Sequence, residues 1–525
     1  MSERPTSDSG WDSMSRRGWF KTLASLPIVG VFLYNFFRKR ARDERIERAI
    51  LSELGVRETG PAVIPDLISR PPSRRIRLGI IGFGGEGESL IRHAGYAHPD
   101  WIEDQREAAR RDPGNKSLET YLNQEDLNVA VTAVCDVFDV RAARAIAASQ
   151  TATPAGGGPS QPPATRYRRY MDLLESDDVD AVIIATPDHW HARMTMDAVR
   201  AGRHVYCEKC MTRTEDEALA VYDSVTNSDI VFQLGHQNRQ SESHNKAREV
   251  IDANILGPVT LVEATTNRNT TWGAWVWEIH EDGNPDTIDW EQFQEPAPHR
   301  MGFSPERFFR WRCWYDYGTG LAGDLLSHEY DAVNQVLRCG IPHSAVASGG
   351  IYYFKDGRDV PDVFQVAYEY PERDMTVVYS ATLANGANRG LKFMGHDGTM
   401  QVSSTLTVSA DSDSTRYADK IKAGIIDPSR PMFTYRDGFR GIDAVTSATE
   451  QYFTSRGLLY TYRGGRRVSA YHLLVKDWLD CIREGGVPSC NIERGFEEAI
   501  TCHMATRSFM EGRRVEWDPV RRRIV

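Results

Sequence analysis

The chain is long enough for more than one domain, and its composition is that of a folded protein. It has 525 residues, of which 41% are hydrophobic and 26% are charged. Its 63 basic and 73 acidic residues give a formal net charge of −10, which argues against a surface for nucleic acid. The 8 cysteines stand mostly alone inside apolar runs, which is typical of buried thiols and not of a disulfide framework.

Residues 1–45 form a leader that we treat as separate from the fold. Residues 15–21 read Ser-Arg-Arg-Gly-Trp-Phe-Lys, which resembles a twin-arginine export signal. This resemblance implies export of the folded protein to the periplasm or cell envelope. As a helix, residues 19–37 would span about 28 Å, close to the bilayer core of about 30 Å, so we expect membrane contact there.

The leader leaves a second location open. No small-residue cleavage site follows its apolar run, which favours an uncleaved anchor. The basic cluster at residues 38–42 favours the cytoplasmic side of a membrane, and an anchor with the rest of the chain in the cytoplasm is the alternative. Residues 46–74 follow as a linker.

From residue 75 the chain alternates short apolar strands with helices. Continuous apolar strands separated by helices predict a parallel sheet covered on both faces, so residues 75–212 are expected to form an α/β doubly wound Rossmann domain. Two polar insertions, at residues 96–128 and 151–165, are expected to be surface loops. The expected strands are 78–81, 129–134, 181–185 and 204–207, and the expected helices are 89–94, 140–148 and 191–201.

After residue 212 the pattern changes to alternating strands. It predicts an α+β domain over residues 213–525, with an open, largely antiparallel sheet that a helix at residues 472–483 closes. The open sheet face favours a homodimer or homotetramer. Residues 410–467 receive no assignment. The expected strands are 259–264, 345–354, 363–370 and 375–380.

Residues 82–87 read Gly-Phe-Gly-Gly-Glu-Gly, between the first predicted strand and its helix. In this context Gly82 permits a tight turn, Gly84 lets a pyrophosphate approach the backbone, and Gly87 packs the helix on the strand. The motif predicts a dinucleotide site, with a plain tight turn as the alternative.

Asp136 ends the second predicted strand. A carboxylate there can accept hydrogen bonds from both adenosine ribose hydroxyls and repel the extra phosphate of NADP, so NAD is the expected cofactor. The alternative role for Asp136 is to cap the next helix. Arg141 stands where it can bind a 2′-phosphate, so NADP remains the alternative cofactor.

Two more segments follow predicted strands, at the sheet edge where ligands bind. They read Ala185-Thr186-Pro187-Asp188-His189-Trp190-His191 and Cys207-Glu208-Lys209-Cys210. Thr186, Pro187 and His191 are expected to contact the cofactor. The segments resemble the Gfo/Idh/MocA family of oxidoreductases, and the resemblance covers roughly residues 75–519.

The resemblance assigns roles to Glu208 and Lys209. In the family, a strand-end Glu-Lys-Pro supplies the Glu to the nicotinamide ribose and the Lys to the reacting hydroxyl. Here Cys210 replaces the Pro, which leaves a formal CxxC pair. Because no second pair with metal-site spacing exists, we expect two ordinary thiols and no metal.

The second half of the site is predicted around residues 311–328. Glycines end at Gly323 and apolar residues then recur at helical spacing, so a helix is expected to begin near Asp324. Asp324 and His328 would share one face of that helix. The family's Asp-x-x-x-His pair stands at this position, and the resemblance implies a catalytic set of Lys209, Asp324 and His328. A capping carboxylate and a surface histidine are the alternative.

Each catalytic role has a chemical reason. His328 would accept the hydroxyl proton, and the positive end of the helix would favour its neutral form. Lys209 would donate a hydrogen bond to the developing alkoxide, while Asp324 would orient His328 or hold a neighbouring hydroxyl. The aromatic residues at 311–317 are expected to pack in the core, which is the commoner fate of such residues, and aromatic faces for a pyranose ring are the alternative.

Three functions remain open. The first is NAD(P)-dependent hydride transfer at a hydroxyl carbon of a sugar or polyol. The second retains NAD and oxidises a sugar transiently, which permits glycoside cleavage, elimination or sugar-to-sugar hydride transfer. The third is a non-catalytic nucleotide-binding sensor, against which the intact Lys209, Asp324 and His328 argue.

Overall fold

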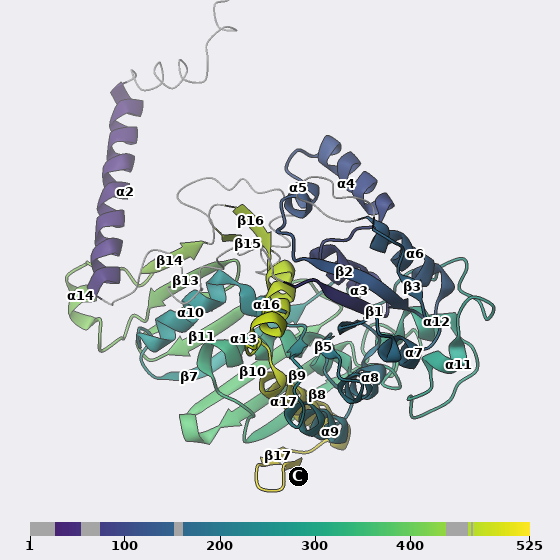
Figure 1. The fold of residues 1–525 in the computed structure, drawn as a ribbon. Coiled ribbons are helices and arrows are strands. Elements are labelled where there is room, and N and C mark those ends of the chain that lie inside the picture. The colour runs from purple at the N-terminus through teal and green to yellow at the C-terminus, as the bar shows by residue number, and fades with distance from the viewer. Residues whose placement is uncertain (1–26, 54–73, 152–160, 437–459, 464–465) are drawn as a thin grey trace, which may run out of the picture.

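The computed structural model describes residues 27–53, 74–151, 161–436, 460–463 and 466–525. Figure 1 shows two large sheets side by side, a parallel sheet formed early in the chain and a broader sheet formed mostly by its second half.

The first sheet has six parallel strands in the order β3-β2-β1-β4-β5-β6. Every residue of β4 is buried, as expected for a strand covered on both faces. The strand order reverses between β1 and β4, which is where doubly wound sheets bind ligands. The predicted Rossmann fold is confirmed. The strands are β1 (Ile76–Ile81), β2 (Val129–Cys135), β3 (Thr165–Arg166), β4 (Ala181–Ile184), β5 (His204–Cys207) and β6 (Phe232–Leu234).

Helices connect these strands and cover the sheet. They are α3 (Gly85–His93), α6 (Asp139–Gln150), α7 (Tyr170–Glu175), α8 (Asp188–Arg200) and α9 (Glu215–Thr226).

The insertion at residues 96–128 is not the surface loop that the sequence predicted. It forms α4 (Pro99–Arg111) and α5 (Ser117–Leu122). Pro99 stands in the first turn of α4, and the side chain of His98 caps it by accepting from the Asp100 N–H, so local signals start a helix here. Of the second predicted loop, residues 152–160 lie outside the described residues, and β3 begins at its end.

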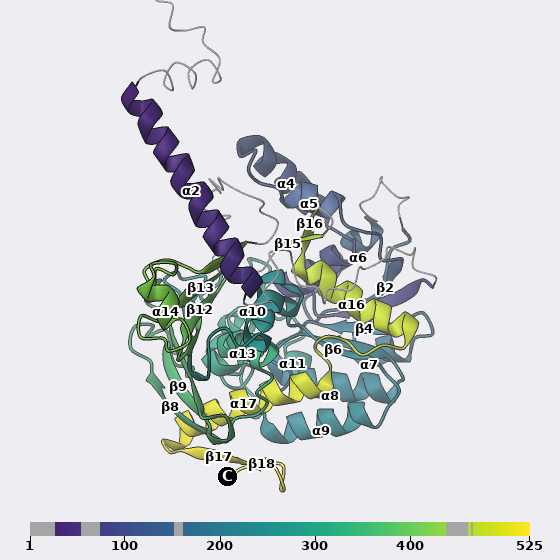
Figure 2. The ribbon, with the colours of Figure 1, turned by 90° about the vertical axis from the view of Figure 1, so that its left-hand side faces the viewer.

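The helix near the C-terminus closes the first sheet and not the second, contrary to the prediction. This helix, α16 (Ala470–Glu484), packs against α3 and buries Trp478, whose ring lies 5.7 Å from that of Tyr206 in β5. Figure 2 shows α16 along the first sheet. Strand β6 also joins this sheet, so the first domain takes up segments beyond the predicted boundary at residue 212. An apolar helix face does not reveal from sequence which sheet it covers.

The second sheet has ten strands in the order β14-β13-β12-β11-β7-β10-β9-β8-β17-β18. Neighbouring strands are antiparallel except β7 and β10, which run parallel. Burial alternates along β10, as expected when one face packs on helices. The predicted open, largely antiparallel sheet is confirmed. The strands are β7 (Val259–Asn267), β8 (Ser344–Gly350), β9 (Val363–Tyr370), β10 (Met375–Thr382), β11 (Leu391–Gly395), β12 (Gly398–Val402), β13 (Thr405–Ala410), β14 (Phe433–Arg436), β17 (Val515–Asp518) and β18 (Arg523–Ile524).

Three helices pack on the inner face of this sheet, and shorter elements lie around them. The three are α10 (Glu242–Asp252), α13 (Ser327–Leu337) and α17 (Ile492–Glu511). The shorter elements are α11 (Trp290–Phe293), α12 (Pro305–Phe309), α14 (Ala418–Lys422) and the hairpin of β15 (Tyr460–Arg463) and β16 (Arg466–Ser469). Part of the unassigned stretch 410–467 therefore adds edge strand β14, and residues 437–459 lie outside the described residues.

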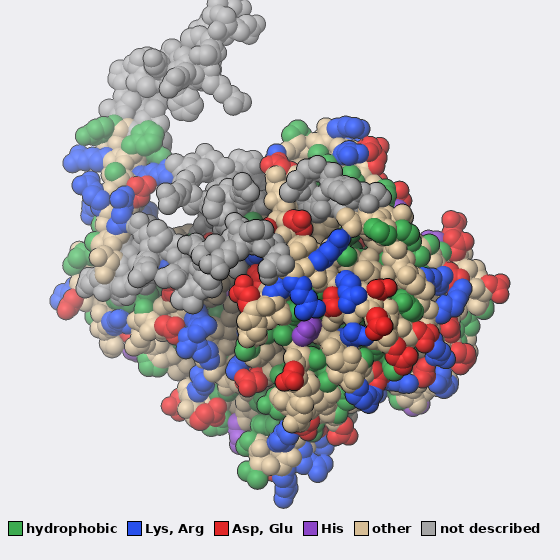
Figure 3. All heavy atoms as spheres, in the orientation of Figure 1, with side chains coloured by type: hydrophobic (Ala, Val, Ile, Leu, Met, Phe, Trp, Pro, Cys, Tyr) green, Lys and Arg blue, Asp and Glu red, His purple; other side chains and the backbone are tan. Residues whose placement is uncertain are grey.

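Helix α2 (Pro27–Glu53) projects from the body in Figures 1 and 2, and basic side chains gather along it in Figure 3. Within the described ranges, no helix combines the length and the apolar character needed to cross a membrane. The twin-arginine motif and residues 19–26 of the expected membrane contact lie outside the described residues.

Candidate active site

A cleft of about 780 Å³ opens at the C-terminal ends of β1, β2, β4 and β5. Its other wall comes from the second domain, from the segment after β7 and from the turn that leads into α13. The cleft therefore lies at the switch point of the first sheet, where both domains contribute side chains.

The glycine turn forms the floor of the cofactor side. Gly82 has φ of 87°, and a Cβ there would lie 2.6 Å from the Ala185 carbonyl oxygen. At Gly87 a Cβ would lie 2.2 Å from the Gly82 carbonyl oxygen, so this glycine packs α3 on the turn. Gly84 lines the cleft and caps α3 without any side-chain hydrogen bond to the first turn. The open helix N-terminus and its bare backbone fit the pyrophosphate of NAD.

Asp136 lies at the edge of the same floor and is buried. Its carboxylate accepts the N–H of Phe83 at 2.6 Å and that of Phe138 at 2.8 Å. Burial raises the pKa of Asp136, and the nearby Arg141 opposes that rise. Asp136 thus holds the turn together while lining the cleft, and its carboxylate has further lone pairs with which it can accept from ribose hydroxyls. Arg141 also lines the cleft, against the rings of Phe308 and Phe309.

The strand-end residues divide into two groups. Thr186 and Pro187 line the cleft, as expected for cofactor contacts. His191 is fully buried behind it, and its two ring nitrogens contact the carbonyl oxygens of Cys210 at 2.6 Å and Thr186 at 2.7 Å. With both nitrogens engaged, His191 ties two strand ends together, and the cofactor contact expected of it stays a prediction.

Glu208 and Glu86 place two buried carboxyls beside the cofactor side of the cleft. Burial raises the pKa of Glu208 well above its ordinary value, and the proximity of Glu86 adds to the rise. Burial likewise raises the pKa of Glu86. Glu208 contacts the Lys209 N–H at 3.3 Å and the Tyr206 hydroxyl at 3.4 Å. Glu208 can therefore present a protonated or hydrogen-bonding carboxyl to a ribose hydroxyl.

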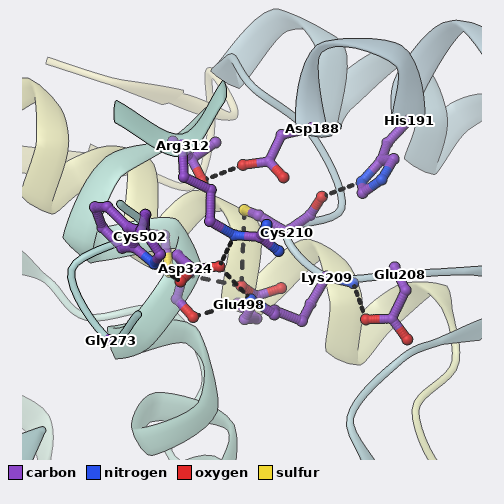
Figure 4. Close-up of polar contacts among 12 residues, drawn as sticks. Asp188, His191, Glu208, Lys209, Cys210, Gly273, Arg312, Asp324, Glu498 and Cys502 are labelled. Carbon is purple, nitrogen blue, oxygen red and sulfur yellow. Dashed lines mark hydrogen bonds and ion pairs between the residues drawn. The ribbon is translucent and has the colours of Figure 1, made fainter. Parts of the chain in front are cut away.

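Asp324 is the centre of the substrate side. It lies in a π-helical turn (Ala322–Leu326) that runs into α13. Its Oδ1 accepts from Lys209 Nζ at 2.7 Å and from Arg312 Nε at 2.8 Å, and its Oδ2 accepts from the Trp275 indole at 3.1 Å. Figure 4 shows Lys209 and Arg312 converging on Asp324 from different domains. Burial opposes its charge, but Lys209 and Arg312 hold the pKa of Asp324 well below its usual range.

His328 follows Asp324 by one turn and also lines the cleft, so the structure brings the three predicted catalytic residues together. Burial, the charge of Lys209 and the neighbouring His236 lower the pKa of His328 well below that of an ordinary histidine. His328 is therefore neutral near pH 7 and able to accept a proton. Since Asp324 is engaged by Lys209, Arg312 and Trp275, it orients Lys209 and not His328.

Sequence reasoning missed several residues of the substrate side. Arg312, Arg268, Trp272, Trp275, Trp277 and Trp311 line the cleft. Of the aromatic residues at 311–317, Trp314 and Tyr317 are buried in the core as expected, whereas Trp311 lines the cleft, next to Arg312. In the sequence, Trp311 and Arg312 belong to no recognisable motif, so nothing there marks them as residues of a site. The one available signal was the density of Trp at residues 272–277.

Asp188 joins the two domains beside the cleft. It begins α8 and accepts the Thr319 hydroxyl at 2.6 Å, so the first domain contacts the turn that precedes Asp324. Burial raises the pKa of Asp188. Figure 4 shows Asp188 near Arg312. The hydrogen bond between Asp188 and Thr319 therefore helps to hold the two domains at the separation at which Lys209 contacts Asp324.

No three His, Cys, Asp or Glu side chains converge as metal ligands in the part of the chain that the structure describes. Cys207 and Cys210 are free and buried, and burial raises their pKa values far from the range of a reactive thiol.

Two family models match the chain and together span most of both domains. The first, described as an oxidoreductase family with an NAD-binding Rossmann fold, matches residues 76–236. The second, described as the C-terminal alpha/beta domain of that oxidoreductase family, matches residues 294–517.

Similar curated proteins share part of the sequence. Levoglucosan dehydrogenase of Pseudarthrobacter phenanthrenivorans is 27% identical over 191 residues, which are 34% of this chain and 41% of that protein. A glycosyl hydrolase family 109 protein of Solibacter usitatus is 27% identical over 185 residues, which are 34% of this chain and 35% of that protein. The matches thus span less than half the length of these relatives.

Solved structures share the fold over nearly their whole length. Levoglucosan dehydrogenase in complex with NADH and L-sorbose has a TM-score of 0.56 at 17% identity, covering 85% of this chain and 100% of that one. The WlbA dehydrogenase from Bordetella pertussis in complex with NADH and UDP-GlcNAcA has a TM-score of 0.52 at 15% identity, covering 85% of this chain and 99% of that one. At these identities the likeness establishes the fold alone.

Proposed function

Because this chain belongs to the Gfo/Idh/MocA family of NAD-binding oxidoreductases, we propose that it transfers hydride between NAD and a hydroxyl-bearing carbon of a sugar or polyol. One observation carries the proposal. Lys209, at a strand end of the Rossmann domain, reaches Asp324 of the second domain within the cleft that also holds the glycine turn and His328. A cation, a carboxylate and a neutral imidazole thereby meet beside the cofactor floor.

These side chains suit the oxidation of an alcohol. NAD, when bound, supplies the acceptor for the hydride. Lys209 Nζ donates a hydrogen bond to the oxygen that develops negative charge, and Asp324 keeps that ammonium in place. His328 accepts the hydroxyl proton, which its lowered pKa permits at neutral pH. Lys209 and Asp324 are both largely buried, with side-chain exposures of 10% and 11%, which strengthens these interactions.

Relatives support a carbohydrate as the substrate. Two solved neighbours are complexes of levoglucosan dehydrogenase with NADH and either levoglucosan or L-sorbose. Both ligands are polyhydroxylated rings or chains whose hydroxyls suit the charged groups around Asp324.

The test is to incubate the purified full chain with NAD and a panel of hexoses, anhydrosugars, polyols and disaccharides, and to follow NADH absorbance. At least one sugar should give sugar-dependent NADH, and Asp324→Asn should abolish it. If neither NADH nor any altered sugar forms with any member of the panel, the proposal is wrong.

A second candidate is transient sugar oxidation by retained NAD, without net redox change. The similarity to a glycosyl hydrolase family 109 protein favours it. Mass spectrometry of the denatured protein distinguishes the candidates, because a retaining enzyme releases about one NAD per chain whereas an exchanging enzyme releases little. Under retention, a glycoside substrate would be cleaved while NADH absorbance stays unchanged.

We also propose export through the leader, which residues 15–21 support by their twin-arginine pattern. That route moves folded proteins, so NAD can be loaded before export. Arg16→Lys together with Arg17→Lys keeps the charge and should remove protease access to the protein in spheroplasts. Unchanged access would eliminate the twin-arginine route and favour a simple anchor.

A further inference from the structure

Trp272 stands at the mouth of the cleft with its side chain largely open to solvent. It is 65% exposed, and it is among the residues that line the cleft. Tryptophan is usually well buried because its large apolar ring is unfavourable in water. An exposed indole that borders a functional cleft is therefore a candidate contact for ligand.

The backbone under Trp272 is held firmly. The Gly273 N–H donates to Thr270 Oγ1 at 2.8 Å, and the Trp277 indole donates to the Trp272 carbonyl oxygen at 3.1 Å. Arg358 donates to the carbonyl oxygen of Ala274, within the same turn, at 3.0 Å. A ring on an anchored turn loses little freedom when a ligand stacks on it.

A strip of aromatic rings leads from Trp272 to the centre of the cleft. The rings of Trp272 and Trp277 lie 6.5 Å apart, and the Arg312 guanidinium lies over Trp277 at 5.1 Å and over Trp311 at 4.2 Å. The same Arg312 donates to Asp324. Figure 4 shows the Gly273 turn on the same side of the site as Asp324.

The strip alternates flat apolar indole faces with the charged guanidinium of Arg312. This alternation restricts the chemical class of ligand that can bind along it. A purely apolar chain would strip water from Arg312 and Arg268 without replacing their hydrogen bonds. A pyranose ring meets both demands, because its C–H face covers an indole while its hydroxyl edge bonds to charged groups. Along this strip Trp272 contacts Trp277 at 6.5 Å between rings, Trp277 lies 5.1 Å from the Arg312 guanidinium, and Arg312 donates to Asp324 at 2.8 Å. Trp272 is thus three contacts away from Asp324 by this route, beyond the groups that contact Asp324 itself, and it offers a separate face to a second ring.

We propose that Trp272 and Trp277 form an outer subsite for a second sugar ring, so that the substrate is a glycoside of at least two rings. The inner ring reacts beside Asp324 and the outer ring stacks on Trp272. This inference rests on the proposed function and narrows it from sugars or polyols to oligosaccharides and glycosides.

The experiment compares hexoses with their α- and β-linked disaccharides on the NAD-loaded full chain. Binding is measured by calorimetry, and turnover by NADH absorbance and by chromatography of the sugars. Wild type should prefer a disaccharide, and Trp272→Ala should reduce the ratio of disaccharide to hexose affinity about tenfold, as expected for one lost stacking contact. Trp272→Phe should restore most of that ratio.

Phe36→Ala is the matched control, because Phe36 is 51% exposed and lies on the projecting helix α2, away from the cleft. It should leave the ratio at the wild-type value. The outer subsite is overturned if Trp272→Ala weakens hexoses and disaccharides equally, or if wild type binds no disaccharide more tightly than its hexose. Sugar binding without any NADH formation or sugar conversion would refute the proposed function while leaving the subsite supported.

Discussion

On the cofactor side of the cleft, recognition comes mainly from backbone within one short segment. Gly82, Gly84 and Gly87 shape a turn, and the open N-terminus of α3 follows at once. On the substrate side, recognition comes from side chains that are distant in sequence. Asp324 alone gathers Lys209, Trp275 and Arg312 from three segments.

The difference explains how each half responds to sequence change. A backbone site depends on the absence of side chains, so it is sensitive at glycines and tolerant elsewhere. A side-chain site depends on ion pairs and hydrogen bonds that single substitutions remove. Substitutions on the cofactor side should therefore change mainly the affinity for NAD, and substitutions on the substrate side should change mainly turnover.

The largest expected effect is on turnover, at Lys209. Lys209→Ala removes the donor to the developing alkoxide and should lower kcat by about 10² to 10³. Asp324 keeps Arg312 and Trp275 as partners, so the fold should persist. The Kd for NAD, measured by fluorescence titration, should change little.

Lys116→Ala is the control for loss of a lysine, since Lys116 lies on the surface in an ion pair with Glu119. It should match wild type in both kcat and Kd. A Lys209→Ala protein with wild-type kcat on a turned-over sugar would remove Lys209 from the mechanism.

A smaller effect, with its own pH signature, is expected at His328. A base acts only when neutral, and burial, Lys209 and His236 lower the pKa of His328. The wild-type rate should therefore hold as the pH falls through the ordinary histidine range and decline only well below it. His328→Ala should lower kcat/KM by about 10² and remove that acid limb.

His299→Ala serves as the matched control, because the His299 side chain is 76% exposed and pairs with Asp316 outside the cleft. Its pH profile should equal that of wild type. If the acid limb survives in His328→Ala, another group accepts the proton.

The same contrast explains what the sequence could predict. The glycine turn and four of the six strands of the first sheet, β1, β2, β4 and β5, follow from local pattern, whereas the short strands β3 and β6 were not predicted. The attachment of α16 to the first sheet was missed, because its apolar face fits either sheet. Lys209, Asp324 and His328 were found through family resemblance, whereas Arg312 and Trp275 belong to no motif and meet Asp324 only through the fold.

A loss of NAD affinity without loss of fold is expected at Gly84. Its backbone has φ of −72°, which any residue adopts, and a Cβ there would lie 3.9 Å from Arg141. Gly84→Val should therefore fold, but its side chain blocks the approach of the pyrophosphate, and the Kd for NAD should rise by several tens of fold. Gly302→Val is the control, since nothing lies within 4 Å of a Cβ at that exposed position. Equal NAD affinity in Gly84→Val and wild type would contradict a backbone cradle.

The smallest effect is expected at Asp136, which follows β2. On the cofactor side, where recognition comes mainly from backbone, Asp136 is a residue that would act through its side chain. Its carboxylate accepts two backbone N–H groups, and Asp136→Asn retains an acceptor for one of them while removing the negative charge next to Arg141. A 2′-phosphate would then meet Arg141 without the repulsion of a carboxylate, so the Kd for NADP relative to that for NAD should fall by about tenfold.

Parallel titrations with NAD and NADP measure this ratio of Kd values, and thermal unfolding reports any loosening of the turn. Asp178→Asn, whose side chain is 80% exposed, should leave the ratio unchanged. If Asp136→Asn lowers the melting temperature yet keeps the wild-type ratio, Asp136 serves the turn alone and cofactor choice is made elsewhere in the cleft.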